Sequence, residues 1–179
     1  MAQVEFEMRA LEVDTADIAR RIAAAGGEHV ADRLMRRFVY DIRPGEQGRW
    51  MRLRDTGSEV TLCVKEISDD AVDGTRETET TVGDFDVTHE LLGLLGFQPK
   101  AYQENRRSSW LLDGVRLEID SWPRIPPYLE IEADDADQVW ATADRLALPR
   151  HALTGANTTA LYASYGIDLA GISDLRFAD

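Results

Sequence analysis

Charged side chains alternate with apolar ones near the start of the chain. Glu5, Glu7 and Arg9 take one side of this stretch, and Phe6 and Met8 take the other. Alternation with a period of two is typical of a β-strand, in which successive side chains point to opposite faces. The two carboxylates would lie about 6–7 Å apart along the strand. Such a face is either a solvated exterior or a pair of metal-ligating carboxylates beside a phosphate-binding cation.

The same pattern of one charged and one apolar face recurs along the chain. Carboxylate clusters suit hard divalent cations such as Mg²⁺ or Mn²⁺, and the guanidinium fork suits phosphate oxygens. A site that offers both would bind a metal–polyphosphate complex, whereas any single pair is compatible with a surface salt bridge. The acidic residues are Glu77, Glu79, Glu118, Asp120, Glu130 and Glu132, and the cations are Arg52, Arg54, Lys65, Arg107 and Arg116.

The segments that carry these residues are predicted to be strands, joined mainly by hairpins. Asp113-Gly114 is a strong tight-turn dipeptide between two of them. We expect strands at 4–11, about 28–42, 49–55, 59–67, 75–82, 98–112, 115–121 and 128–133.

Amphipathic segments between the strands predict helices with aspartate or threonine caps. We expect them at 14/15–25, 84–95, 134/135–146 and about 157–165, and the tail 167–179 is ambiguous. This succession argues for an α+β fold with a large antiparallel sheet or an eight-stranded antiparallel β-barrel and flanking helices. If the sheet is open, its charged faces meet solvent; if it closes, they line the interior. Several unpaired charges in a dry barrel would be costly, so such a bore must be hydrated, ion-paired or filled by a ligand.

Length, charge and the distribution of apolar residues limit the possible classes of function further. The 179 residues suit one large domain, 1–179, and the formal net charge of −13 disfavours nonspecific nucleic-acid binding without excluding a small anion in a locally basic site. The chain has no secretory pattern and no apolar run near the roughly 20 residues that span a bilayer. We therefore expect no membrane association and a cytoplasmic location.

Cysteine and histidine contribute little to a predicted site. Cys63 is the single cysteine, which excludes an internal disulfide, and we expect it to be a small core residue. His29, His89 and His151 lack the spacing of metal ligands and are expected at the surface or packed against helices. No glycine-rich phosphate loop precedes a helix.

Taken in order, the charged motifs resemble the CYTH superfamily, the triphosphate tunnel metalloenzymes. This group includes class IV adenylyl cyclases, thiamine triphosphatases and inorganic triphosphatases. Its hallmark Glu-x-Glu-x-Lys is matched by Glu5-Phe6-Glu7-Met8-Arg9. Further matches over about 1–166 are Arg52-Leu53-Arg54, Thr61-Leu62-Cys63-Val64-Lys65, Arg76-Glu77-Thr78-Glu79, Arg107-Ser108-Ser109-Trp110, Arg116-Leu117-Glu118-Ile119-Asp120, Tyr128-Leu129-Glu130-Ile131-Glu132 and Ala163-Ser164-Tyr165.

The resemblance implies an eight-stranded antiparallel tunnel that binds a triphosphate end-on with Mg²⁺ or Mn²⁺. It implies catalytic positions at Glu5, Glu7, Arg9 and Lys65. It implies one or two metal ions held by Glu5, Glu7, Asp120, Glu130 and Glu132. It implies phosphate contacts from Arg9, Arg52, Arg54, Lys65, Arg107 and Arg116, with supporting roles for Glu77, Glu79 and Glu118.

Two positions depart from the family pattern. Arg9 replaces the motif lysine, and because arginine stays charged at ordinary pH, it can bind phosphate but cannot accept a proton as a base. Asn105 stands where a basic residue is frequent, so one phosphate contact is weaker or is supplied by Arg106.

Four hypotheses follow for the function. The first is a metal-dependent hydrolase of inorganic, nucleoside or thiamine triphosphate, with Glu5 or Glu7 orienting the attacking water. The second is a class IV adenylyl cyclase that converts ATP to cyclic AMP and pyrophosphate, for which Trp110, Trp122 and Tyr128 are candidate adenine contacts. The third is a non-catalytic barrel that binds polyphosphate or a nucleotide, and the fourth is a purely structural barrel.

In the enzymatic hypotheses the partner is a small-molecule triphosphate, and the protein is a monomer or a homodimer.

Overall fold

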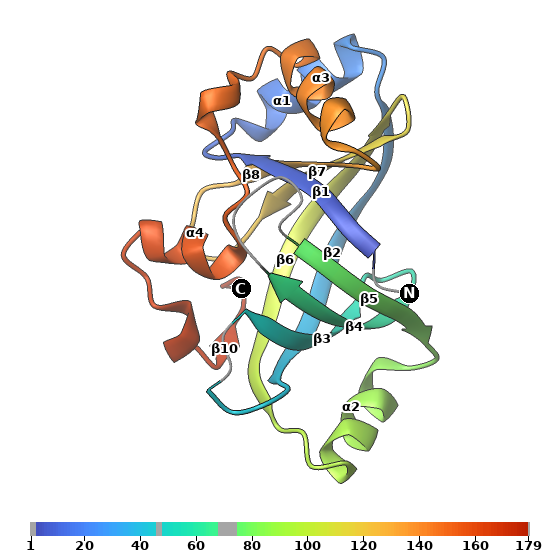
Figure 1. The fold of residues 1–179 in the computed structure, drawn as a ribbon, viewed down its shortest axis with the longest axis vertical. Coiled ribbons are helices and arrows are strands. Elements are labelled where there is room, and N and C mark those ends of the chain that lie inside the picture. Colours follow the sequence, from blue (N-terminus) through green and yellow to red (C-terminus); the bar gives the residue numbers. More distant parts are fainter. Residues whose placement is uncertain (1–2, 46–47, 68–74, 179) are drawn as a thin grey trace.

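A computed structural model describes residues 3–45, 48–67 and 75–178, without the side chains of residues 3–5 and 75. Within these ranges, eight strands form the body of the fold (Figure 1). They are β1 (Gln3–Ala10), β2 (Glu28–Asp41), β3 (Arg49–Asp55), β4 (Val60–Ile67), β5 (Thr75–Val82), β6 (Pro99–Leu112), β7 (Val115–Ser121) and β8 (Tyr128–Ala133).

The eight strands pair in a closed antiparallel ring. The order around it is β1, β5, β4, β3, β2, β6, β7 and β8, and β8 returns to β1. The pairing of β6 with both β2 and β7 completes the ring. Two short strands are added outside it: β9 (Leu153–Thr154) pairs with β1, and β10 (Asp174–Leu175) runs parallel to β6. The predicted α+β fold with an eight-stranded antiparallel barrel is confirmed.

Local sequence explains the turns and helix starts. Asp113 and Gly114 both adopt positive φ angles, 49° and 88°, as the tight turn between β6 and β7 requires. The helices are α1 (Thr15–Ala24), α2 (Phe85–Leu94), α3 (Ala136–Arg145) and α4 (Thr158–Ser164). In α1, α2 and α3 the side chain of a preceding aspartate caps the first turn, from Asp14, Asp84 and Asp135 respectively.

Helices cover the outward apolar faces of the barrel. Figure 1 shows α1 and α3 at one end of the molecule and α2 at the other. Ile22 of α1 and Val139 of α3 are fully buried in one cluster with Leu117 of β7 and Ile131 of β8. Burying each such aliphatic side chain stabilises the fold by about 1.5–3 kcal/mol. Because the apolar faces point outward to the helices, the charged faces of the same strands point inward.

The C-terminal segment packs beside the barrel. It contains α4, the short 3₁₀ helix Leu169–Gly171 and β10, and its residues Tyr162 and Leu175 are almost fully buried. The tail that the sequence left ambiguous therefore joins the core through β10. No helix in the described part of the chain combines the length and the apolar character needed to cross a membrane.

Candidate active site: a charged tunnel

The barrel encloses a cavity of about 1100 Å³, which is at the upper end of the volumes of small-molecule sites. Every strand of the ring contributes to its lining, and residues of α4 and the segment before it line it as well. One inward residue from each of β1 to β8 is, in order, Glu7, Met35, Arg52, Lys65, Glu79, Arg107, Asp120 and Glu130. The alternation of the strands therefore places charge from separate segments around one cavity.

Carboxylates gather on β1, β7 and β8. Strand register brings Glu130 beside Arg9 on one side and opposite Glu118 on the other. Apart from Glu132, which is half-buried, these carboxylates are at most 9% exposed. We call this group the acidic wall; it consists of Glu7, Glu118, Asp120, Glu130 and Glu132.

Arg9 connects two members of the acidic wall. Its Nη2 donates to Oε1 of Glu7 at 2.9 Å, and its Nε donates to Oε2 of Glu130 at 2.8 Å. Its Nη1 donates to the backbone carbonyl of Ala156 at 2.9 Å, which ties the segment before α4 to β1. Burial alone would lower the pKa of Arg9, but Glu130 and Glu7 together raise it above its ordinary value. Arg9 is therefore a fixed cation.

Arg107 of β6 holds the other part of the acidic wall. Its Nε and Nη2 donate to the two carboxylate oxygens of Asp120 at 2.8 and 2.5 Å, and Nη2 lies 3.4 Å from Oε1 of Glu130. Burial opposes ionisation of Glu130, yet Arg9 and Arg107 outweigh it and lower the pKa of this carboxyl to about 2. Asn105 donates from Nδ2 to Oδ1 of Asp120 at 3.0 Å, so it supports the wall through a neutral hydrogen bond.

Glu118 has an unsatisfied oxygen. Its Oε2 is buried and has no hydrogen-bond partner among the described residues, and the Nε of Arg107 lies 3.9 Å away. Burial raises the pKa of Glu118, and Arg107 only partly counteracts this effect. A buried carboxylate oxygen without a donor is costly, and a cation beside it would remove that cost. This oxygen and its carboxylate neighbours are hard ligands of the type that Mg²⁺ and Mn²⁺ prefer.

Cations gather on β2, β3 and β4, and two glutamates of β5 bind several of them. Arg52 contacts Glu77 at 2.7 Å and Glu79 at 3.2 Å, and Lys65 contacts Glu77 at 2.9 Å. The cationic group, which we call the basic wall, consists of Arg37, Arg52, Arg54 and Lys65.

Of the sequence-predicted cations, Arg54 has the longest nearest contact with a described carboxylate. Its Nη2 lies 3.6 Å from Glu79, and its Nε is buried with no hydrogen-bond partner in the described part of the chain. Burial, and then the like charges of Arg52 and Arg107, lower the pKa of Arg54 to about 10. A guanidinium in this position gains most from an anion in the cavity, because the anion offsets both burial and repulsion.

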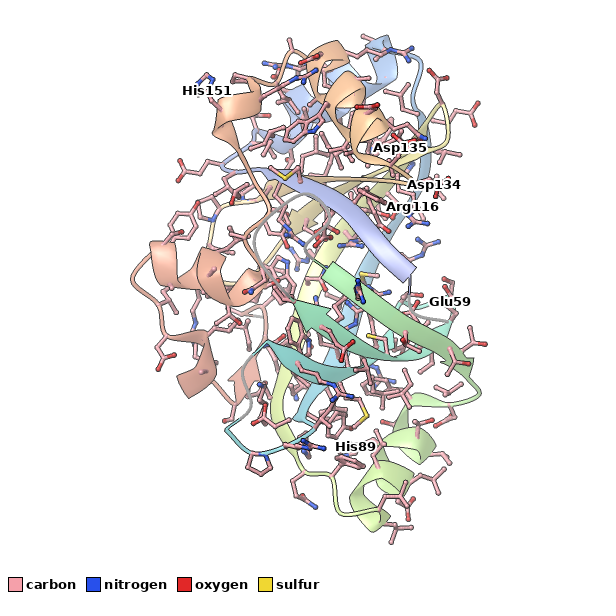
Figure 2. The ribbon with its side chains drawn as sticks, in the orientation of Figure 1. Glu59, His89, Arg116, Asp134, Asp135 and His151 are labelled. Carbon is pink, nitrogen blue, oxygen red and sulfur yellow. The ribbon has the colours of Figure 1, made fainter. Side chains whose placement is uncertain are left out.

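The predicted site residues are distributed between the tunnel interior and its edge. The predicted residues that line the cavity are Glu7, Arg9, Arg52, Arg54, Lys65, Glu77, Glu79, Arg107, Glu118, Asp120, Glu130 and Glu132. Arg116, labelled in Figure 2, also lines it, but its side chain is 57% exposed. It forms an ion pair with Glu132. The side chain of Glu5 lies outside the described part of the structure.

Sequence reasoning did not identify the contribution of β2. Arg33 and Arg37 line the cavity together with Met35. The sequence contained a signal for this face. Residues 33, 35 and 37 alternate with the outward residues Leu34 and Phe38, so they take the opposite, inner face of the strand.

Histidines lie away from the cavity lining, as expected. His89 stacks on Phe38 with 4.0 Å between ring centroids, and its Nδ1 is 2.8 Å from the hydroxyl of Tyr40. His151 is exposed, and His29 faces Asp32 at 3.0 Å. Figure 2 shows His89 and His151 at opposite ends of the molecule.

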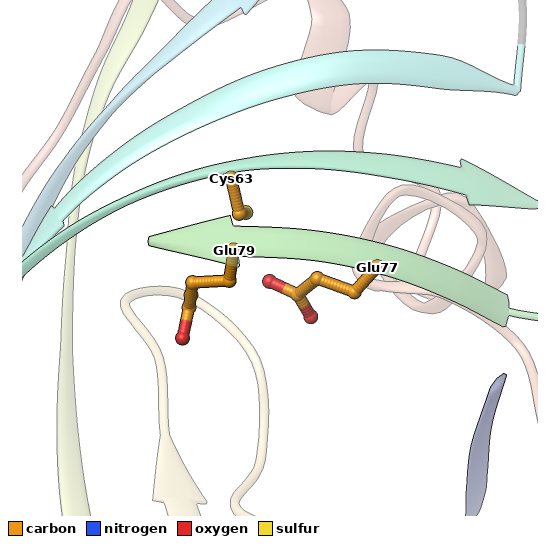
Figure 3. A group of neighbouring side chains, drawn as sticks. All are labelled: Cys63, Glu77 and Glu79. Carbon is orange, nitrogen blue, oxygen red and sulfur yellow. The ribbon is translucent and has the colours of Figure 1, made fainter. Parts of the chain in front are cut away.

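Cys63, Glu77 and Glu79 form a second group that could hold a metal ion (Figure 3). One ligand atom from each lies within 4.8 Å of the others. Cys63 is 1% exposed, as expected for a core residue, and burial raises its pKa to about 12, so its thiol is protonated. Both glutamates already bind cations of the basic wall. A protonated, soft thiol makes this group a poorer match for Mg²⁺ or Mn²⁺ than the acidic wall.

Solved structures share this fold. A conserved hypothetical protein from Pyrococcus furiosus is 22% identical, with a TM-score of 0.73 over 86% of this chain and 97% of its own. A Vibrio parahaemolyticus protein provisionally described as an adenylate cyclase is 14% identical, with a TM-score of 0.76 over 91% and 99%. A Hippeastrum protein, provisionally described as an adenylyl cyclase and reported to have a dominant triphosphatase activity, is 16% identical, with a TM-score of 0.60 over 96% and 100%.

No curated protein matches the sequence. The sequence profile of the CYTH domain, in contrast, matches residues 3–159, which is most of the chain and includes all eight strands of the barrel. This match covers the residues of both the acidic and the basic wall. The chain therefore belongs to the CYTH domain family.

Proposed function

We propose that this protein hydrolyses a triphosphate group, inorganic or carried by a nucleoside or thiamine, with Mg²⁺ or Mn²⁺ as cofactor. The observation that carries the proposal is the opposition of an acidic and a basic wall across one cavity, each with a buried polar atom that has no hydrogen-bond partner in the part of the chain that the structure describes. In the acidic wall this atom is Oε2 of Glu118, and in the basic wall Nε of Arg54 is one of several. A metal–triphosphate complex supplies a cation for the first and anionic oxygens for the second.

The acidic wall would hold the metal. Glu7, Glu118, Asp120, Glu130 and Glu132 present carboxylate oxygens from three adjacent strands, and Glu5 would join them if it follows the alternation of β1. A bound divalent cation would neutralise phosphate oxygens and lower the pKa of a coordinated water. Arg9 fixes the orientation of Glu7 and Glu130, and because its pKa is raised, it does not serve as a base.

Three cations of the basic wall, Arg52, Arg54 and Lys65, would hold the phosphate oxygens. Arg54 and Lys65 lie where they could contact the substrate, and Arg52 is positioned between them by Glu77 and Glu79. During hydrolysis the oxygen of water bonds to phosphorus and the bridging phosphorus–oxygen bond breaks. Negative charge then spreads over the equatorial oxygens, and fixed guanidinium groups stabilise that charge without reorganising.

The test is phosphate release from tripolyphosphate, ATP and thiamine triphosphate, each with Mg²⁺ or Mn²⁺. Glu7→Gln is the control, because it keeps the shape of the side chain and removes its charge. We expect turnover by the native protein and a large loss in the control. No turnover above the control with any of these substrates would contradict the proposal.

The cyclase remains the second candidate, and the size of the cavity is the observation that favours it. A volume of about 1100 Å³ leaves room for a nucleoside, and Trp50 is among the lining residues. Trp122 and Tyr128 also line the cavity, but they are buried and hydrogen-bonded to each other at 2.9 Å. Measuring cyclic AMP in the ATP reaction separates the two: phosphate without cyclic AMP supports the hydrolase, and cyclic AMP with pyrophosphate supports the cyclase.

A further inference from the structure

Arg37 of β2 lies directly opposite Arg54 of β3 in the strand register. Like charges at opposed positions of an antiparallel pair destabilise it, so this arrangement needs a compensating feature. Both side chains line the cavity, so the two guanidinium groups belong to one wall of the tunnel.

The surroundings of Arg37 fix its position without neutralising its charge. Its Nη2 donates to Oδ1 of Asn105 at 2.7 Å, and its guanidinium carbon lies 4.2 Å from the ring centroid of Trp122. Asn105 in turn donates to Asp120, so its amide orientation is fixed on both sides. These contacts hold a planar, forked donor in one orientation, which is the form suited to recognising an oxyanion.

An anionic partner for Arg37 is absent from the described part of the chain. No described carboxylate oxygen lies within 4.0 Å of its guanidinium nitrogens, and its Nε is buried without a hydrogen-bond partner. Burial, and then the charges of Arg52 and Arg54, lower the pKa of Arg37 to about 9.

The adjacent residue, Arg36, provides an internal comparison. It points to the outer face of β2, where its Nε contacts Asp55 at 3.0 Å and its guanidinium lies 4.3 Å from the ring centroid of Phe85. Among the described carboxylates, that of Asp55 lies within 4.0 Å of the outer arginine and none lies within 4.0 Å of the inner one.

We propose that Arg37 and Arg54 form an anion subsite that binds oxygens of one phosphoryl group of the triphosphate. The subsite rests on the proposed function and adds Arg37 to it, a residue that the charged motifs do not include. One phosphoryl group has enough oxygens to accept hydrogen bonds from both guanidinium groups. Its negative charge attracts both of them and so offsets the repulsion between them.

The test is calorimetric titration of tripolyphosphate into the full chain in buffer with EDTA. Removing divalent ions prevents metal-dependent turnover and isolates binding to the basic wall. Arg37→Gln is compared with Arg36→Gln, which removes the same charge one residue away on the outer face. Arg37→Met, which keeps an apolar contact with Trp122, replaces the glutamine variant if that variant does not fold, and circular dichroism verifies folding.

We expect loss of Arg37 to weaken tripolyphosphate binding about tenfold, as for one charge-assisted hydrogen bond, and Arg36→Gln to change it less than twofold. We also expect the rise in melting temperature caused by tripolyphosphate to shrink in the Arg37 variants alone. Equal affinity in the Arg37 variants and the native protein would overturn the subsite and leave the proposed function intact. If the native protein binds none of tripolyphosphate, ATP and thiamine triphosphate, with EDTA or with Mg²⁺, both the subsite and the proposed function are wrong.

Discussion

Arg9 and Glu130 are paired residues of neighbouring strands, and Nε of the arginine donates to Oε2 of the carboxylate at 2.8 Å. Both side chains are less than 10% exposed. The same guanidinium reaches Glu7 and the carbonyl of Ala156, so one side chain connects β1, β8 and the segment before α4. A lysine has a single nitrogen and cannot reproduce this spread of contacts. The arginine in place of the family lysine therefore has a structural consequence.

Replacing Arg9 should destabilise the fold, because its hydrogen bonds join three separate segments of the chain. We expect Arg9→Lys to lower the free energy of unfolding by about 1–3 kcal/mol. Arg9→Ala leaves the buried carboxylate of Glu130 without its main partner and should lower it by about 3–5 kcal/mol. Urea unfolding measures both values. Arg20→Lys is the matched control, because Arg20 forms an exposed pair with Asp17 and its replacement should cost less than about 0.5 kcal/mol. Equal effects of Arg9→Lys and the control on stability would show that the hydrogen bonds of Arg9 contribute little.

Arg54 is the predicted phosphate contact whose replacement should affect catalysis most directly. Its Nε has no hydrogen-bond partner among the residues that the structure describes, so substrate rather than protein would satisfy it. We expect Arg54→Ala to lower kcat/KM for tripolyphosphate about tenfold or more, as for a lost charge-assisted hydrogen bond. Steady-state kinetics over a range of substrate concentrations measures the loss. Arg36→Ala serves as the control because Arg36 lies on the outer face, and it should retain activity within about twofold. An Arg54 variant as active as this control would place the phosphates elsewhere.

Glu118 should contribute to metal affinity through its unsatisfied oxygen. We expect Glu118→Gln, which keeps the shape and removes the charge, to weaken Mn²⁺ binding about tenfold. Titration followed by electron paramagnetic resonance of free Mn²⁺ gives the dissociation constant. Glu66→Gln is the control, since Glu66 is exposed and paired with Arg49, and it should bind Mn²⁺ as the native protein does. Unchanged affinity in the Glu118 variant would place the metal elsewhere, for example at Glu77 and Glu79.

Strand alternation allowed much of the tunnel to be predicted from the sequence, because it is a local property. Once β1 and β8 are recognised as strands, the inward faces of Arg9 and Glu130 follow from a period of two. Arg37 could have been found in the same way, but β2 was assigned from its apolar residues alone. The face of a residue is thus readable from sequence wherever both faces of a strand are considered.

The position of a residue along the tunnel and its contacts with distant segments of the chain are not local properties, so they could not be predicted from the sequence. Arg116 lies on the predicted inward face, but it is the second residue of β7 and reaches only the exposed edge. The contact between Arg9 and Ala156 joins residues far apart in the chain, and nothing in either segment indicates it. The cation-binding role of Glu77 and Glu79 likewise depends on the neighbour order β3, β4, β5, which is set by the whole ring.

The reactivity of Cys63 tests whether its thiol is buried in the wall of the barrel. Burial raises its pKa to about 12, so below that pH the folded protein keeps the thiol protonated and unreactive. We expect iodoacetamide at pH 8 to leave the folded protein unlabelled and to label it rapidly in urea, where a free thiol has a pKa of about 8.5. Mass spectrometry counts the labels. Ala24→Cys, at an exposed position of α1, is the positive control and should acquire a single label while folded. Rapid labelling of the native chain would mean that Cys63 is accessible as a thiolate, and would favour the group of Cys63, Glu77 and Glu79 as the metal centre.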